Sequence, residues 1–288
     1  MDELAAQFEQ HRTHLRAVAY RMLGSQAEAD DAVQEAWLRL ARTDETSIQN
    51  LRGWLTTVVA RICLDMLRTR TARREDALDV HVPDPIVTSG PEDEAELADS
   101  VGLALLVVLD TLAPAERLAF VLHDVFAVPF DEIGPILDRS PGAAKQLASR
   151  ARSRLRGAPV HGEVSAARQR EIINAFLAAS REGNFEGLLN VLDPDVVLRA
   201  DAGAGPMGPS QLLRGARVVA GQALHFADLA QFAHPVLVNG RPGFVAVVDG
   251  RIVSVLSVTV VDDRIAEMNI LADPERLSRI DAASLGLA

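Results

Sequence analysis

The chain has 288 residues, of which 48% are hydrophobic and 24% charged, and its formal net charge is −11. The length suggests two or three domains, and the composition is typical of a globular protein. No apolar run reaches the roughly 18–20 residues of a membrane span, and no signal segment opens the chain, so we expect a cytoplasmic protein without membrane contact. The single cysteine, Cys63, excludes an internal disulfide and a Cys-x-x-Cys zinc site, and we expect it in the core.

The first 74 residues show the apolar periodicity of helices. Gly24 and Ser25 end one helix, and Ser25 followed by Glu28 has the pattern of a capping box that begins a second one. The second helix has an apolar stripe on one face. Its other face carries Asp30, Asp31, Gln34 and Glu35.

After a loop, a third helix runs from an apolar start into an arginine-rich end. The stretch from Arg52 to Arg74 contains six arginines and one acid, Asp65. The spacing of Arg61, Asp65 and Arg68 places them on one face. Positive side chains are stabilised near the C-terminal end of a helix by its dipole, and this explains the presence of one or two of the six arginines.

An acidic segment follows. From Glu75 to Glu116 there are eleven acids and no Lys or Arg. Within the sequence DVHVPDPIVTSGPEDEAE, Pro83 and Pro85 break any helix, so we expect a linker at residues 76–100. The linker is either a solvated tether or an acidic strand that lies in a cationic groove of a partner.

The next segment has the pattern of a helix–turn–helix. A short helix that begins near Phe130 leads to a turn, and Pro141 suits the first position of the helix that follows. From Arg139 to Arg156 there is no acid. The polar face of this helix suits a DNA major groove, although a solvated basic face is the alternative. That face carries Lys145, Gln146, Ser149, Arg150, Arg152 and Ser153.

The C-terminal third has a different pattern. Two segments with the apolar periodicity of helices come first. They are followed by short Val-rich runs that are separated by Asn-Gly, Asp-Gly and Asp-Asp turns. Such runs are typical of antiparallel hairpins. We therefore expect an α+β cone at residues 165–280.

The helical part resembles domains 2 and 4 of bacterial sigma factors. HRTHLRAVAYRMLGSQAEADDAVQEAWLRLAR is similar to the polymerase-binding segment of domain 2, and NLRGWLTTVVARICLDMLRTR is similar to its promoter-reading helix. TLAPAERLAFVLHDVFAVPFDEIGPILDRSPGAAKQLASRARSRLR resembles domain 4. The short plan is that of the extracytoplasmic-function group. The resemblance implies two all-α domains, at 1–75 and 101–157, in a subunit that directs promoter-specific transcription initiation.

The resemblance also implies which surfaces bind the partners, core RNA polymerase and promoter DNA. The clamp helices of the largest polymerase subunit would contact Asp30, Asp31, Gln34, Glu35 and Leu38. The opened −10 element would contact Asn50, Arg52, Arg61, Asp65 and Arg68. The −35 element would contact Arg139, Lys145, Gln146, Ser149, Arg150, Arg152 and Arg154. In addition, the loop Thr43–Leu51 would hold a flipped base, domain 4 would bind the flap of the second-largest subunit, and the linker would thread the RNA channel.

The C-terminal part resembles the SnoaL-like domains, and sigma factors with such an extension form a subgroup. Three motifs of the subgroup have counterparts here. Residues 81–85 occupy the place of the motif Trp-Leu-Pro-Glu-Pro. Residues 201–205 occupy the place of Asp-Gly-Gly-Gly-Lys, and residues 273–277 occupy the place of Asn-Pro-Asp-Lys-Leu. Regulatory contacts are implied for Pro83, Pro85, Asp201, Asp273 and Pro274.

A catalytic cone would need ionisable groups that converge on one pocket. The candidates are Asp201, His225, Asp228 and His234. Because lone histidines beside apolar neighbours are usually structural, we expect a regulatory module without catalysis, cofactor or metal. The alternatives are a ligand-sensing DNA-binding regulator that acts without polymerase, and an enzyme with a tethered DNA-binding domain. The sequence identifies neither an anti-sigma protein nor a ligand.

Overall fold

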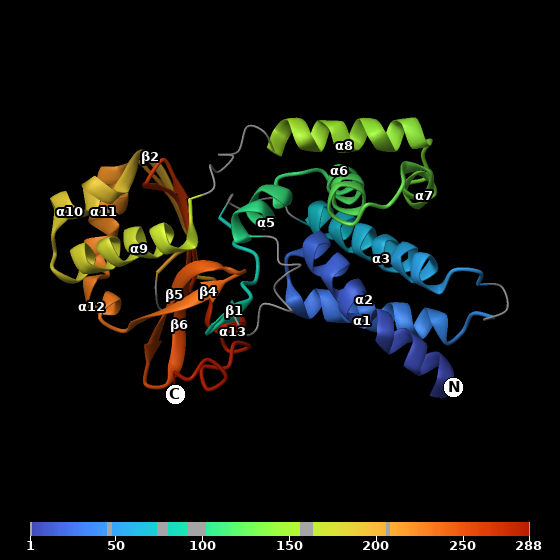
Figure 1. Ribbon diagram of the computed structural model, residues 1–288, viewed down its shortest axis with the longest axis horizontal. Coiled ribbons are helices and arrows are strands. Elements are labelled where there is room, and N and C mark those ends of the chain that lie inside the picture. Colours follow the sequence, from blue (N-terminus) through green and yellow to red (C-terminus); the bar gives the residue numbers. More distant parts are fainter. Residues whose placement is uncertain are drawn as a thin grey trace. The chain divides into compact units, whose positions relative to one another are not determined.

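The computed structural model describes residues 2–44, 48–73, 80–90, 102–155, 164–205 and 208–287. The chain divides into two compact units, each built from two stretches of sequence (Figure 1). One comprises Met1–Asp76 and Val108–Ala158, and the other comprises Ala77–Val107 and Pro159–Ala288. None of the helices in the described ranges combines the length and apolar character that a bilayer crossing needs.

The first unit is helical, as predicted. It contains α1 (Asp2–Leu23), α2 (Gln26–Leu40), α3 (Leu51–Arg73), α6 (Pro114–Phe120), the π-helical turn η3 (Val121–Val125), α7 (Phe130–Ile136) and α8 (Pro141–Leu155). Helix α5 (Leu103–Asp110) leads into α6. Cys63 is fully buried in α3, and burial raises the pKa of its thiol, so the predicted core position is confirmed.

The capping box predicted at the start of α2 forms only in part. Ser25 Oγ accepts a hydrogen bond from the Glu28 backbone N–H at 3.5 Å, which is the N-cap half of the motif. The Glu28 carboxylate instead pairs with Arg70 of α3. This charge-assisted pair joins α2 to α3.

A buried arginine connects the N-terminal helices with the later ones inside this unit. Arg117 of α6 is 2% exposed. Its Nε and Nη2 donate to the backbone oxygen of Arg21 in α1, at 3.3 and 3.1 Å, and its Nη1 pairs with Asp110. Because a buried guanidinium is costly without partners, these bonds hold α6 firmly against α1.

Helices α7 and α8 form the predicted helix–turn–helix. A Cβ at Gly134 would lie 2.8 Å from the Arg139 carbonyl oxygen, so only glycine allows the turn to approach α7 this closely. Ser140 Oγ accepts from the Ala143 N–H at 3.2 Å and caps α8, whose first residue is Pro141. The segment that precedes α7 consists of the α-helix α6 and the π-helical turn η3.

The second unit is the predicted α+β cone. Its helices are α9 (Ala166–Arg181), α10 (Phe185–Val191), α11 (Ala216–His225), α12 (Ala227–Ala230) and α13 (Pro274–Leu277). Its strands are β1 (Val87–Thr88), β2 (Leu192–Asp201), β3 (Gln211–Arg214), β4 (Ala233–Val238), β5 (Arg241–Val248), β6 (Arg251–Val261) and β7 (Arg264–Leu271). The strand order is β1-β4-β5-β6-β7-β2-β3, antiparallel except between β2 and β7.

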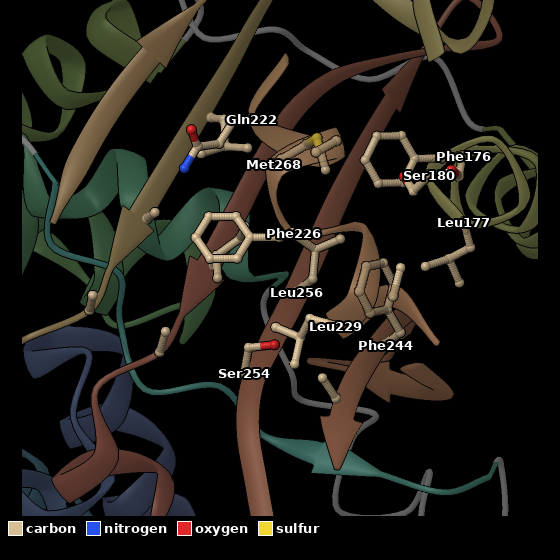
Figure 2. A pocket seen from close by; sticks show the side chains of 18 of the residues that line it. Phe176, Leu177, Ser180, Gln222, Phe226, Leu229, Phe244, Ser254, Leu256 and Met268 are labelled. Atoms are coloured by element: carbon tan, nitrogen blue, oxygen red, sulfur yellow. Dashed lines mark hydrogen bonds between the residues drawn. The ribbon is translucent and has the colours of Figure 1, made fainter. Parts of the chain in front are cut away.

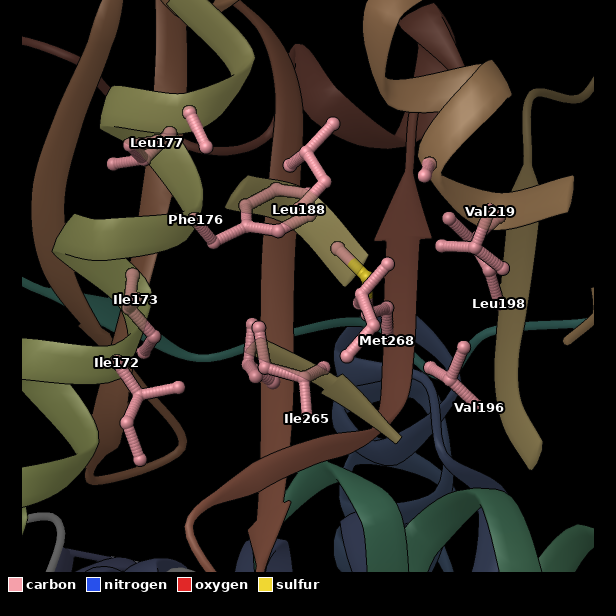
Figure 3. Close-up of a cluster of buried hydrophobic side chains, with 14 of the residues drawn as sticks. Ile172, Ile173, Phe176, Leu177, Leu188, Val196, Leu198, Val219, Ile265 and Met268 are labelled. Carbon is pink, nitrogen blue, oxygen red and sulfur yellow. The ribbon is translucent and has the colours of Figure 1, made fainter. Parts of the chain in front are cut away.

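The hairpins β4–β5, β5–β6 and β6–β7 turn where the sequence predicts. Their turns have positive φ at both central residues, for example 49° at Asn239 and 72° at Gly240. Two successive positive φ angles suit the right-handed twist of a two-residue hairpin. Helices α9, α10 and α11 cover one face of this sheet with a continuous apolar core (Figure 3). Its labelled members include Phe176, Leu188 and Met268.

The described part of the linker belongs to the sheet. Strand β1 pairs with β4 through Val87 with Val238 and Thr88 with Leu237. Two hydrogen bonds join Ile86 and Asn239: the Ile86 N–H donates to Asn239 Oδ1 at 3.0 Å, and the Asn239 N–H donates to the Ile86 carbonyl at 2.7 Å. The interpretation as a solvated tether is therefore wrong for this stretch, because its backbone pairs with β4 at the edge of the sheet. Residues 76–79 and 91–100 of the predicted linker lie outside the described residues.

Candidate nucleic-acid interface and linker anchor

The part of α8 up to Arg150, together with the turn before it, presents an exposed basic face. The exposed residues are those predicted for base recognition, with Arg139 in the turn: Arg139, Lys145, Gln146, Ser149 and Arg150. Ala144, Ala148 and Ala151 form the buried stripe of the helix. These small residues let α8 pack closely on α6 and α7. The long polar side chains therefore lie on the opposite face.

The end of α8 behaves differently. Arg152 Nε donates to Asp124 Oδ1 of η3 at 2.7 Å, and Arg154 Nη1 donates to Glu116 Oε2 of α6 at 2.8 Å. Glu116 is 5% exposed, so its carboxylate depends on this arginine for charge compensation. The structure thus gives these two arginines a structural role that the sequence did not predict, although the side chain of Arg154 remains 55% exposed.

Helix α2 presents an acidic face with one exposed apolar side chain. Asp30, Asp31 and Gln34 are exposed, and Glu35 is half-buried. Leu38 is 42% exposed beside them. Arg16 pairs with Asp30 at 2.8 Å and Arg39 with Glu35 at 2.9 Å. Exposed pairs of this kind are worth at most about 1 kcal/mol, so a partner's cations can replace them.

The residues predicted for the −10 element all lie at the start or along α3. Asn50 Oδ1 accepts from the Gly53 N–H at 3.1 Å and caps the helix. Arg52 is exposed, as are Asp65 and Arg68, whose side chains lie 3.5 Å apart. Arg61 instead donates from Nη2 to the Pro135 carbonyl of α7 at 3.0 Å. Residues 45–47, in the loop predicted to hold a flipped base, lie outside the described part of the chain.

Three segments far apart in sequence meet around one guanidinium in the cone. Arg276 Nη1 donates to Asp201 Oδ2 at 2.8 Å, its Nε donates to Asp84 Oδ1 at 2.6 Å, and its Nη2 donates to the Val82 carbonyl at 2.5 Å. The Val82 N–H donates to Asp201 Oδ2 at 3.1 Å. We call Val82, Asp84, Asp201 and Arg276 the linker anchor, because they hold residues 80–88 against the cone.

The loop that follows Asp201 is shaped to fit the start of α13. A Cβ at Gly203 would lie 2.3 Å from Asp273 Oδ2, and Gly203 has a φ of +52°. A Cβ at Gly205 would lie 2.7 Å from Pro274 Cδ. Asp273 accepts from the first N–H groups of α13 and so fixes the helix that carries Arg276. Glycine at both positions therefore allows the anchor to assemble.

Electrostatics favours the ionised form of Asp201. Burial alone raises the pKa of this carboxyl, but the hydrogen bonds from His81 and the Val82 N–H and the charge of Arg276 outweigh burial and lower its pKa to about 2. His81 Nδ1 lies 3.3 Å from Asp201 Oδ2. The carboxylate is thus negative at any physiological pH, as its pairing with Arg276 requires.

The structure brings together the residues predicted for regulatory contacts. Pro83 and Pro85 are buried beside the anchor segment, and Asp201, Asp273 and Pro274 lie in or next to the anchor. Sequence reasoning did not single out Asp84 and Arg276. Their signal was charge: Asp84 stands where the subgroup motif has Glu, and Arg276 stands where it has Lys.

The ionisable groups considered for catalysis do not converge. His225, Asp228 and His234 are exposed, and Asp201 is part of the anchor. None of the four belongs to the described lining of the cavity between the helices and the sheet. These four residues thus form no acid–base pair in that cavity.

Comparison with known proteins follows the same division. Residues 7–73 match the family model Sigma-70 region 2, and residues 102–155 match Sigma-70, region 4. The probable ECF RNA polymerase sigma factor SigI of Mycobacterium tuberculosis is 34% identical, over 98% of this chain and 97% of its own. ECF RNA polymerase sigma factor SigJ of the same organism is 36% identical, over 95% and 93%. The crystal structure of SigJ matches with a TM-score of 0.75 and 34% identity, covering 95% of this chain and 98% of that one.

Proposed function

This chain belongs to the extracytoplasmic-function family of RNA polymerase sigma factors. We propose from that membership which of its surfaces bind core polymerase and which bind promoter DNA. It is a sigma factor that binds core polymerase and promoter DNA and directs transcription initiation. The finer assignment of residues to each contact is our proposal, as is its site of action in the cytoplasm, where core polymerase is found.

The −35 element is recognised by the exposed part of α8. The observation that carries this proposal is the run of Lys145, Gln146, Ser149 and Arg150 on one face, with no acid from Arg139 to the helix end at Leu155. Lys and Arg donate to guanine and Gln pairs with adenine in a major groove. Arg152 and Arg154 hold α8 on its support helices and make at most a secondary contact with phosphates.

Run-off transcription with core polymerase tests this assignment. The double variant Lys145→Ala, Arg150→Ala should lose promoter selectivity, by roughly 1–3 kcal/mol for each base-specific contact. Arg251→Ala, which removes an exposed arginine of the cone, is the matched control and should leave selectivity unchanged. Unchanged selectivity in the double variant would remove α8 from promoter recognition.

The acidic face of α2 binds the clamp helices of the largest polymerase subunit, and the exposed side of α3 contacts the opened −10 element. Leu38 supports the first contact, because an exposed leucine among acids gives an interface an apolar centre with a charged rim. Arg52 and Arg68 support the second contact, since both side chains are exposed, and the surface pair between Arg68 and Asp65 is weak enough for a phosphate to replace it. Arg61 joins them only if it leaves the Pro135 carbonyl.

The cone regulates the sigma domains without catalysis of its own. The anchor supports this proposal, because it ties the segment that joins regions 2 and 4 to the C-terminal domain. A chain that ends before Gly162 should therefore differ from the full chain in reconstituted transcription. Equal activity of the two would refute the regulatory role. An enzyme is distinguished by substrate turnover that Asp201→Asn abolishes.

A regulator that acts without polymerase is the second candidate. It would bind duplex promoter DNA tightly by itself, whereas a sigma factor of this plan should bind it only with core polymerase. The match of residues 7–73 to Sigma-70 region 2 favours the sigma factor. A mobility-shift measurement with and without core polymerase separates the two.

A further inference from the structure

The cone contains an apolar cavity of about 110 Å³ between its helices and the concave face of its sheet. Figure 2 shows side chains of α9, α11 and strands β5 to β7 turned toward one another around it. The rings of Phe176, Phe226 and Phe244 form much of the wall, together with Leu256 and Met268. A dry apolar cavity of roughly 150 Å³ takes up benzene in another protein, so this one is of the size that holds a single small ring.

The wall offers no charge and a few hydrogen-bonding groups. None of the described residues that line the cavity is an acid, a base, a cysteine or a tyrosine. Ser180 donates its hydroxyl proton to the Phe176 carbonyl at 2.9 Å. Within the described part of the chain, the side chains of Gln222 and Ser254 make no hydrogen bond to the protein, so they are available to a ligand.

We propose that this cavity binds a small, uncharged, mainly apolar molecule with one hydrogen-bonding group, and that its occupancy strengthens the linker anchor. A charged molecule is excluded because the wall offers no counter-ion to offset the loss of its hydration. The polar group of the ligand bonds to Gln222 or Ser254, and the ring lies among the three phenylalanines.

The link to the anchor is covalent and short. Ala202 and Ala272 line the cavity. Ala202 directly follows Asp201 in the chain, and the Ala272 N–H donates to the Asp201 carbonyl at 2.7 Å. The Ala202 N–H donates at 3.0 Å to Ser210 Oγ, which lies 3.5 Å from Asp201 Oδ1. The same backbone therefore forms the cavity wall and positions the carboxylate that holds Val82 and Arg276.

Linkage sets the sign of the effect. The ligand binds the form in which the cavity wall is assembled, and the anchored linker holds that wall in place. Ligand binding therefore favours docking of the linker, and docking of the linker increases the affinity for the ligand by the same factor. The biological meaning of this coupling rests on the proposed regulatory role of the anchor. The coupling itself, between the cavity and the anchor, can be measured without polymerase.

Binding is tested on the full chain by calorimetric titration with three probes. Benzene and benzyl alcohol should bind and raise the melting temperature, whereas benzoate, which has the same ring and a charge, should not.

Ala223→Phe fills the cavity from α11 and should abolish binding. Because that variant can also perturb folding, Ser254→Ala with Gln222→Leu is the second test: it should weaken benzyl alcohol several-fold and leave benzene unchanged. Equal binding of benzoate, or no binding of either neutral probe, overturns the site.

Coupling is tested by hydrogen exchange of the Val82 and Ile86 amides, both of which donate to cone side chains. Saturating benzyl alcohol should slow their exchange several-fold, and Arg276→Met should weaken benzyl alcohol by the same factor. Unchanged exchange in the liganded protein overturns the coupling and leaves the binding site standing. Failure of the transcription assays described above would instead overturn the sigma-factor assignments and leave both of these measurements unaffected.

Discussion

Replacing Arg276 by methionine should release the linker from the cone. The side chain of Arg276 is 16% exposed, and those of its partners Asp84 and Asp201 are 12% and 13% exposed. Methionine keeps most of the volume but removes the charge and three donors. Two mostly buried carboxylates then lose their cation, and breaking a buried pair in this way costs about 3–5 kcal/mol.

The variant escapes that cost by undocking residues 80–88, which lets both carboxylates hydrate. A change of 3 kcal/mol corresponds to about a 100-fold change in an equilibrium at ~1.4 kcal/mol per factor of ten. The Val82 and Ile86 amides should therefore exchange at least about 100-fold faster, or as fast as unprotected amides if the wild-type docking energy is smaller. Hydrogen exchange detected by NMR measures this directly.

The control is Arg279→Met, two residues beyond α13. Arg279 is 49% exposed and lies 3.6 Å from Glu275, which is 86% exposed, so its loss should leave both amides as protected as in the wild type. If Arg276→Met exchanges within twofold of the wild type at both amides, the anchor is not what holds the linker.

Three further predictions concern separate parts of the chain. The pKa of Asp201 is about 2, below its ordinary value near 3.8, so the stabilisation from its ionised form is complete above pH ~4 and lost as pH falls toward 2; carboxyl-detected NMR should give that midpoint, and His81→Ala should raise it. Gly203→Ala should lower the melting temperature and unprotect the linker, because the new Cβ meets Asp273 and φ is positive. Leu38→Asp should weaken core-polymerase binding at least several-fold without changing the melting temperature, measured by fluorescence anisotropy.

Local signals in the sequence were sufficient for most of the fold. The hairpin turn at Asn239 and Gly240 requires positive φ at two adjacent residues, and these residue types tolerate it, so the turn is visible without its neighbours. The helix–turn–helix is local for the same reason, since Pro141 directly follows the turn and begins the second helix. Periodicity and turn residues act over a few positions, which is why they can be read in order along the chain.

The errors arose where distant charges meet. Glu28 left its capping box for Arg70, which is 42 residues away, and the spacing of one helix cannot reveal such a partner. Arg276 and Asp84 are separated by 192 residues, and their contact depends on the fold of the whole cone. The linker likewise looked like a tether because a two-residue strand has no periodicity of its own.

The helix α8 shows how a chain with a net charge of −11 presents a basic surface. Charges in solution are screened over about 8–10 Å, so the potential near α8 depends on its immediate neighbours and not on the total. Two acids of its support helices, Glu116 and Asp124, are each neutralised by an arginine from the end of α8. Those pairs fasten the helix to its support and leave Lys145 and Arg150 exposed without acids on α8 to oppose them. One helix thus separates attachment, through Arg152 and Arg154, from recognition, through the exposed residues Lys145 to Arg150.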